Sequence, residues 1–98
     1  MMSSDNLLTP EQAREIQEQL FATYRQQSSR HVPVHLPRKD FWEMVKRLLT
    51  TLDLEIHRMI RKHGADLRVQ NEQTRQANVR HIASELARRR LVAMMQHV

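Results

Sequence analysis

The 98-residue sequence has no cysteine, one glycine, three prolines and only 4% aromatic residues. Without cysteine there is no disulfide framework, no thiol nucleophile and no cysteine zinc site. Sheets need frequent turns, and turns draw heavily on glycine and proline, so their scarcity argues against β-structure. The remaining residues are rich in Leu, Met, Ala, Gln, Glu, Lys and Arg, which favour helices. The sequence therefore predicts an all-α fold.

Long apolar runs are also missing. No uninterrupted apolar stretch is long enough to span a bilayer, and the N-terminus has neither the basic start nor the apolar core of a secretory signal. We therefore expect a cytoplasmic protein without a membrane partner. A hydrophobic content of 40% excludes a wholly disordered chain, and 98 residues leave room for a single domain.

Proline and glycine divide the chain into three predicted helices. Thr9, Pro10 and Gln12 form a capping-box pattern at the start of the first helix, and Gly64 is placed to end the second in the left-handed region. The polar composition of residues 70–76 leaves open whether the start of the third segment is helix or loop. The predicted segments are a flexible tail (1–8), a helix (9–28), an extended connector (29–37), a second helix (38–63) and a third (66–97).

The second predicted helix carries an apolar arc of roughly 160°, wider than the ~100° that one neighbouring helix covers. It must therefore contact two neighbours, or one neighbour and another chain. Helices of this length overrun a compact domain, so we expect an elongated antiparallel hairpin with the first helix against one side. We assign the excess apolar surface to a partner interface made of Phe41, Trp42, Val45, Leu49, Ile56, Ile60, Leu86 and Met94.

The residue spacing offers no catalytic or metal site. His57 and His63 are six residues apart and so fall on different helix faces, whereas helical zinc pairs are four apart; His31 and His35 flank Pro33 in the connector. No serine lies in a nucleophile-elbow pattern, and one glycine cannot build a phosphate-binding loop. We predict a protein that is not an enzyme and has no metal, no cofactor and no small-molecule substrate.

Positive charge concentrates in the predicted hairpin. Basic and acidic residues number three and four in residues 1–36, seven and four in 37–64, and six and three in 65–98. Such a surface favours nucleic acid through counterion release, with Arg88 and Arg89 as possible contacts. Consecutive arginines point in different directions on a helix, however, and no aromatic residues interleave with them for base stacking. Because of its basic charge, the alternative prediction for this chain is a small nucleic-acid-binding protein.

Two charged residues fall on apolar arcs, where an unpaired charge is costly. In an antiparallel hairpin, the end of the third helix returns to the level where the second begins. We expect Arg90 to be less exposed than Arg88. The predicted structural ion pairs are Arg90 with Asp40 or Glu43, and Glu55 with Arg75.

The segment Leu36-Pro37-Arg38-Lys39-Asp40-Phe41-Trp42 resembles the Leu-Pro-x-Asp-Phe-aromatic start of a helix in archaeal GINS proteins. Arg90-Leu91-Val92-Ala93-Met94 is similar to the Arg-Leu-x-x-hydrophobic end of the long helix that follows in that family. The resemblance covers roughly residues 36–98. The family usually carries a small β domain as well, for which 98 residues leave no room.

The resemblance implies a non-catalytic helical scaffold subunit of the replisome. Such a subunit assembles with related GINS subunits as a homo- or hetero-oligomer. The complex joins the MCM helicase to a Cdc45- or RecJ-like protein in DNA replication, which implies association with the nucleoid. Attachment of this chain to polymerase or helicase through a β domain is not expected.

Overall fold

The computed structural model describes residues 7–30 and 32–97, the side chain of His97 excepted, and over these ranges it contains helices and no strand. The helices are α1 (Pro10–Ser28), α2 (Phe41–His63) and α3 (Leu67–His97). The predicted all-α fold is confirmed.

α1 begins with the predicted capping box. The Thr9 hydroxyl accepts a hydrogen bond from the Gln12 backbone N–H (3.1 Å), and the Gln12 side-chain oxygen accepts one from the Thr9 N–H (3.0 Å). Directly before this cap, Leu8 is buried and its N–H donates to the Thr51 hydroxyl of α2 (3.0 Å). The prediction of a flexible tail is therefore wrong at Leu8, because apolar burial and one long-range hydrogen bond hold it; residues 1–6 lie outside the described residues.

α2 begins at Phe41, three residues later than predicted, and ends at His63 as predicted. Asp40 is the N-cap residue, but its carboxylate is engaged by the Arg38 side chain and makes no capping hydrogen bond. Gly64 follows the helix with φ of 71°, a backbone conformation in which side chains are strained, and its N–H donates to the Ile60 carbonyl (2.8 Å).

α3 includes the whole polar stretch 70–76, so the question left open by the sequence is answered in favour of helix. The Asp66 carboxylate accepts a hydrogen bond from the Val69 N–H (3.1 Å) at the start. Val69 is buried, and Arg75 and Gln76 donate hydrogen bonds to side chains of α1 and α2. Tertiary contacts thus hold a segment that has little apolar periodicity of its own.

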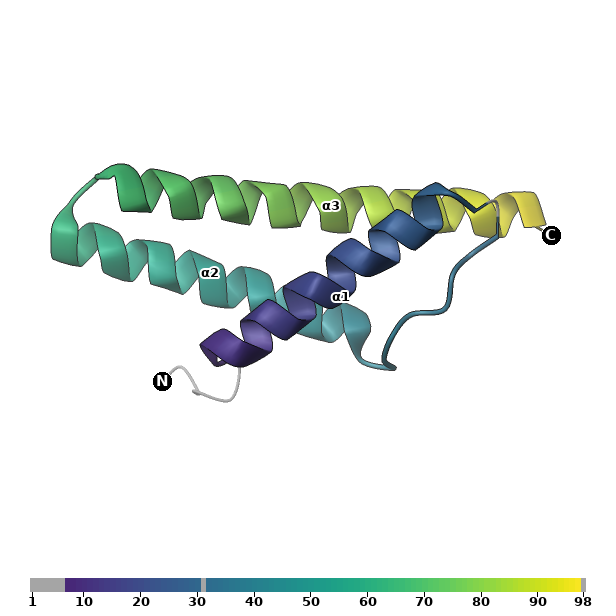
Figure 1. Ribbon diagram of the computed structural model, residues 1–98, viewed down its shortest axis with the longest axis horizontal. Coiled ribbons are helices and arrows are strands. Elements are labelled where there is room, and N and C mark those ends of the chain that lie inside the picture. Colours follow the sequence, from purple (N-terminus) through teal and green to yellow (C-terminus); the bar gives the residue numbers. More distant parts are fainter. Residues whose placement is uncertain (1–6, 31, 98) are drawn as a thin grey trace.

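α2 and α3 form an antiparallel hairpin, and α1 crosses it diagonally (Figure 1). The molecule measures 51 × 28 × 20 Å, with a radius of gyration of 15.3 Å, against about 13 Å for a compact domain of this length. The predicted elongated shape is confirmed. α3 runs past the start of α2, and the end of α1 and the connector lie beside its last turns (Figure 1).

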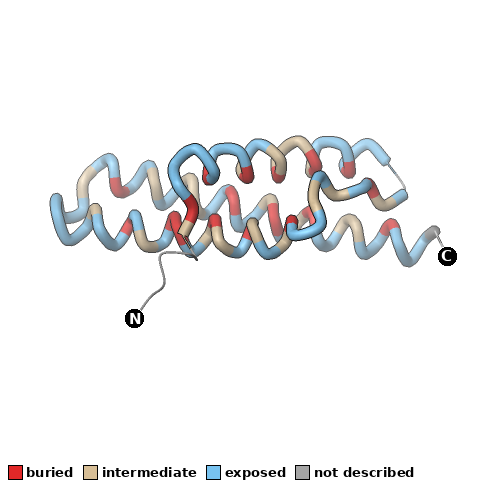
Figure 2. The backbone as a smooth tube through the Cα atoms, turned by 90° about the horizontal axis from the view of Figure 1, so that it is seen from below, coloured by how far each residue is buried: buried red, intermediate tan, exposed pale blue. Residues whose placement is uncertain are grey.

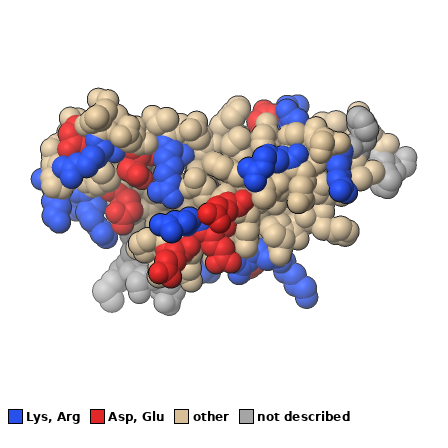
Figure 3. Space-filling model, in the orientation of Figure 1, with Lys and Arg blue, Asp and Glu red and all other residues tan. Residues whose placement is uncertain are grey.

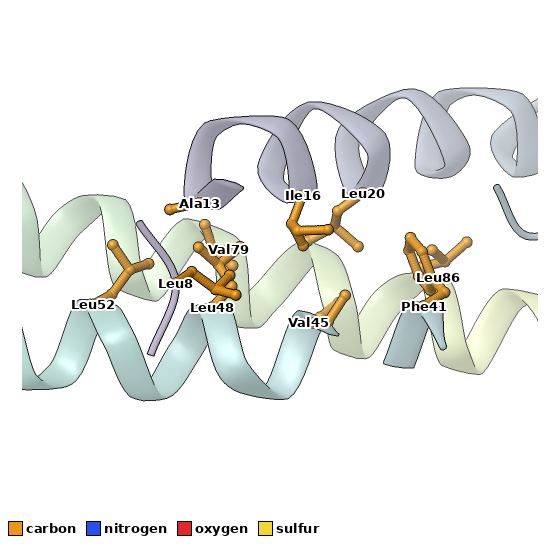
Figure 4. Close-up of a cluster of buried hydrophobic side chains, with 11 residues drawn as sticks. Leu8, Ala13, Ile16, Leu20, Phe41, Val45, Leu48, Leu52, Val79 and Leu86 are labelled. Carbon is orange, nitrogen blue, oxygen red and sulfur yellow. The ribbon is translucent and has the colours of Figure 1, made fainter. Parts of the chain in front are cut away.

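The core lies where the three helices meet, and buried residues recur along their facing sides (Figure 2). α1 packs against both members of the hairpin. The wide apolar arc of α2 is therefore covered by two neighbours within the same chain. The core residues labelled in Figure 4 are Leu8, Ala13, Ile16, Leu20, Phe41, Val45, Leu48, Leu52, Val79 and Leu86.

Candidate interaction surface

Half of the predicted interface residues belong to the core. Phe41, Val45, Ile56 and Leu86 are each at most 4% exposed. The assignment of these four residues to a partner interface is wrong, because α1 and α3 of the same chain cover the arc on which they lie. The arc width alone did not distinguish an internal neighbour from another chain.

The other four predicted interface residues divide into two groups. Trp42 and Leu49 are partly buried and pack against the core, with the Trp42 ring edge-on to the Phe41 ring at 5.0 Å. Ile60 is 39% exposed near the turn between α2 and α3, and Met94 is 42% exposed near the end of α3. Surface for a partner therefore remains at the two ends of the molecule.

The larger exposed apolar surface is at the end of α3. Leu91 is 55% exposed, Met94 42% and Met95 71%, and their spacing places them on one side of the helix, away from the buried Ala93. We call these three residues the C-terminal apolar face. Phe41, the first residue of α2, lies beside Leu86 (Figure 4), so the face is on the part of α3 that extends past the hairpin. From Leu86 to His97 this extension is about 16 Å long.

Sequence reasoning found Met94 in this face but missed Leu91 and Met95. The run Leu91-Val92-Ala93-Met94-Met95 held a signal for them. Five consecutive apolar residues occupy every side of a helix, and one packed neighbour covers only part of its circumference. Some of the run therefore had to be exposed or covered by another molecule.

Beside this face, a cleft of about 260 Å³ separates the end of α1 from the end of α3. The Arg88 guanidinium donates to the Glu85 carboxylate (2.7 Å), which holds the pKa of Glu85 below its usual value. The Arg89 guanidinium is 3.6 Å from the same carboxylate and lies over the Tyr24 ring, 5.4 Å from its centre. The cleft is lined by Gln27, Ser28, Arg30, Arg88, Arg89, Val92, Ala93 and Gln96.

The predicted ion pairs of Arg90 are wrong. Its Nε donates to the Val34 backbone carbonyl (3.3 Å), whereas Asp40 is paired with Arg38 and Glu43 with Arg47. The reason is the connector, which passes the end of α3 and presents a carbonyl where a carboxylate had been expected. The prediction that Arg90 is less exposed than Arg88 is confirmed, since Arg90 is partly buried and Arg88 is exposed.

The predicted pair of Glu55 with Arg75 is also wrong. Glu55 pairs with Arg58 one helical turn away (3.4 Å). Arg75 pairs with Glu72 (3.6 Å) and donates a hydrogen bond to Gln17 of α1 (2.8 Å). α1 lies close enough to the hairpin for its Gln17 to accept the Arg75 hydrogen bond that the sequence assigned to Glu55 of α2.

A wider groove of about 750 Å³ lies between the start of α1 and the hairpin near its turn. Leu8, Ala13, Leu52 and Met59 contribute apolar surface to it, and charges of both signs border it in equal number. The bordering charged residues are Arg14, Glu18, Glu55, Arg68, Glu72 and Arg75. A groove with balanced charge does not favour a ligand of either sign.

Among the described residues, no three His, Cys, Asp or Glu side chains come together as a metal site requires. His35 and His57 are exposed, and His57 Nδ1 lies 2.8 Å from the Asp53 carbonyl of its own helix. His31 of the sequence prediction lies outside the described residues. Within residues 7–30 and 32–97, no helix combines the length and apolar character of a membrane span.

Comparison of the chain with protein-family models, curated proteins and solved structures finds no match.

Proposed function

We propose that the chain is a non-catalytic scaffold subunit of a GINS-like complex that supports the replicative helicase. The observation that carries the proposal is the C-terminal apolar face, where Leu91, Met94 and Met95 stand exposed on an extension of α3. Monomeric proteins seldom leave neighbouring large apolar side chains uncovered without a partner. Methionine is also enriched in protein interfaces, because its flexible thioether adapts to the opposing surface.

The spatial arrangement of the two GINS-like segments supports this assignment. Residues 36–42 lead into α2 and residues 90–94 lie near the end of α3, at the same end of the molecule. The connector joins them through the hydrogen bond from Arg90 to Val34, and Phe41 packs in the core with Leu86. The sequence similarity therefore falls on one continuous region of the structure.

The proposed partners follow from the resemblance. Related GINS subunits would cover the C-terminal apolar face, and the assembled complex would contact the MCM helicase and a Cdc45- or RecJ-like protein at the nucleoid. Direct nucleic-acid binding by Arg88 and Arg89 has weaker support, because Glu85 lies within ion-pair distance of both side chains and offsets part of their charge.

Site-specific photo-crosslinking in the native host tests the proposal. A photoreactive residue at Met95 should capture a related helical subunit, or a helicase component, identified by mass spectrometry. The same residue at Leu67 is the matched control, since Leu67 is 70% exposed at the opposite end of α3. Equal capture of the same proteins from both positions, or capture of no replication protein from Met95, would contradict the proposal.

A further inference from the structure

We propose that the cleft between the ends of α1 and α3 is a docking site for an acidic, amphipathic segment of a partner protein. The cleft lies on a different side of α3 from the C-terminal apolar face, and the proposal does not depend on the GINS-like assignment. The partner segment would place a carboxylate in the cleft and an apolar side chain beside it.

Charge is the first observation that supports this ligand. Arg30, Arg88 and Arg89 line the cleft, and Glu85 is the carboxylate that pairs with them. Three guanidinium groups against one carboxylate leave a positive site. The side chain of Arg30 is exposed, so its guanidinium is accessible to a ligand. Arginine suits carboxylates because its planar group can donate two parallel hydrogen bonds.

The C-terminal end of α1 beside the cleft does not cancel this charge. The C-terminus of a helix carries partial negative charge on its unpaired carbonyls. At the end of α1, the Gln26 carbonyl accepts from Ser29, through both its N–H (3.4 Å) and its hydroxyl (3.1 Å). The Gln27 carbonyl accepts from the Arg30 N–H (3.2 Å). These bonds satisfy carbonyls that would otherwise repel an anion.

The floor of the cleft is held in place by buried contacts. Gln27 is 2% exposed, and its side chain bonds to the connector at the Val32 carbonyl and the Val34 N–H, both at 3.0 Å. Arg89 is positioned by the Tyr24 ring and by Glu85. Anchored groups lose little conformational entropy when a ligand binds, which favours affinity.

The apolar border favours a protein segment over nucleic acid. Val92 is 41% exposed and lines the cleft. A phosphate backbone gains little from an apolar neighbour, whereas an amphipathic segment buries an apolar side chain on it. The Arg89 guanidinium lies over one face of the nearby Tyr24 ring, so that face is not free to stack on a base.

The surface charge pattern agrees with an acidic partner. On the face shown in Figure 3, acidic side chains gather mainly over the half of the molecule that holds the α2–α3 turn and the start of α1. The opposite end, where α3 finishes, displays basic side chains. Basic side chains lie over both halves, and fewer acidic side chains oppose an acidic segment at the cleft end.

Fluorescence anisotropy with a labelled amphipathic peptide of Glu and Leu tests the proposal. Replacement of both exposed arginines, in Arg30→Gln/Arg88→Gln, should weaken binding by about tenfold or more, as expected for losing charge-assisted hydrogen bonds. Arg58→Gln/Arg61→Gln is the matched control, because it removes the same charge from exposed positions at the far end of α2 and should leave binding unchanged.

Three results would overturn the proposal. They are equal weakening by both variant pairs, absence of peptide binding, and arginine-dependent binding of single-stranded DNA in place of the peptide. Circular dichroism confirms that each variant is folded. Light scattering separates this site from the proposed subunit interface, because Arg30→Gln/Arg88→Gln should leave self-association intact.

Discussion

At the scale of single residues, many charged side chains form local ion pairs on the surface. Arg38 with Asp40, Arg47 with Glu43 and Arg88 with Glu85 are all within four positions of one another. Such exposed pairs contribute little to stability. Arg90 differs, because it is partly buried and its donor reaches a carbonyl 56 positions away in the sequence.

Arg90→Ala should therefore destabilise the fold by about 1 kcal/mol, because one hydrogen bond is lost and the Val34 carbonyl loses its partner. Arg88→Ala should have a smaller effect. In a double-mutant cycle measured by urea unfolding, Arg90→Ala and Asp40→Asn should be additive, since Asp40 pairs with Arg38. A clear coupling energy between Arg90 and Asp40 would contradict this expectation and support the ion pair that the sequence predicted.

Acid should weaken the fold through carboxylates bonded in the native state. The Val69 N–H lowers the pKa of Asp66, and Arg38 lowers the pKa of Asp40. A carboxyl group whose folded pKa lies below its unfolded value stabilises the fold above that unfolded value, and this contribution disappears as pH falls through the folded one. Unfolding midpoints in urea should therefore drop as pH falls below about 4.

Asp66→Asn is the variant that tests this pH dependence, because asparagine can still cap α3 but does not titrate. Its stability at neutral pH should stay close to that of the parent, and its loss of stability in acid should be smaller. An acid profile that coincides with that of the parent would show that Asp66 does not contribute to the pH dependence.

At the scale of the helices, local signals predicted where most elements begin and end. Capping residues and Gly64 marked the start of α1 and the end of α2 because a cap depends on residues a few positions apart. The diagonal path of α1 and the course of the connector could not be read from such local patterns. The connector is held by Gln27, a buried polar residue that no apolar periodicity reveals. The ion-pair and interface predictions were wrong where α1 and the connector pack against the hairpin.

The Thr9 cap provides an element-scale test. Thr9→Ala removes the hydroxyl that accepts from the Gln12 N–H and should cost about 1 kcal/mol of folding free energy. Thr74→Ala is the control, because Thr74 is exposed inside α3 and its hydroxyl bonds only to the Gln70 carbonyl of its own helix. Equal losses in thermal unfolding would contradict the assigned role of the capping box.

The two sides of α3 should respond differently to the same substitution. Leu86 is fully buried and Leu91 is 55% exposed. Leu86→Ala should cost about 2–5 kcal/mol through lost burial and a cavity, while Leu91→Ala should stay within about 0.5 kcal/mol in the monomer. A large loss for Leu91→Ala under monomeric conditions would mean that this side of α3 belongs to the core.

At the scale of the whole molecule, the three helices complete their own core and leave apolar surface on the extension of α3. The sequence predicted excess apolar surface on the arc of α2, but α1 and α3 cover most of that arc. Most of the large apolar side chains that remain exposed lie near the end of α3, and Ile60 and Leu67 are exposed at the other end of the elongated molecule. Exposed apolar side chains near the end of α3 are the observation that supports the proposed subunit association.

Light scattering of three purified proteins tests this central claim most directly. The parent chain should self-associate, or associate with a related subunit, at tens of micromolar, and should hold that state as salt rises, because apolar contacts are not screened. Met95→Glu should abolish association without loss of helicity, whereas Leu67→Glu, equally exposed at the other end of α3, should associate like the parent. A parent chain that stays monomeric alone and with related subunits, or equal association by all three proteins, would contradict the account.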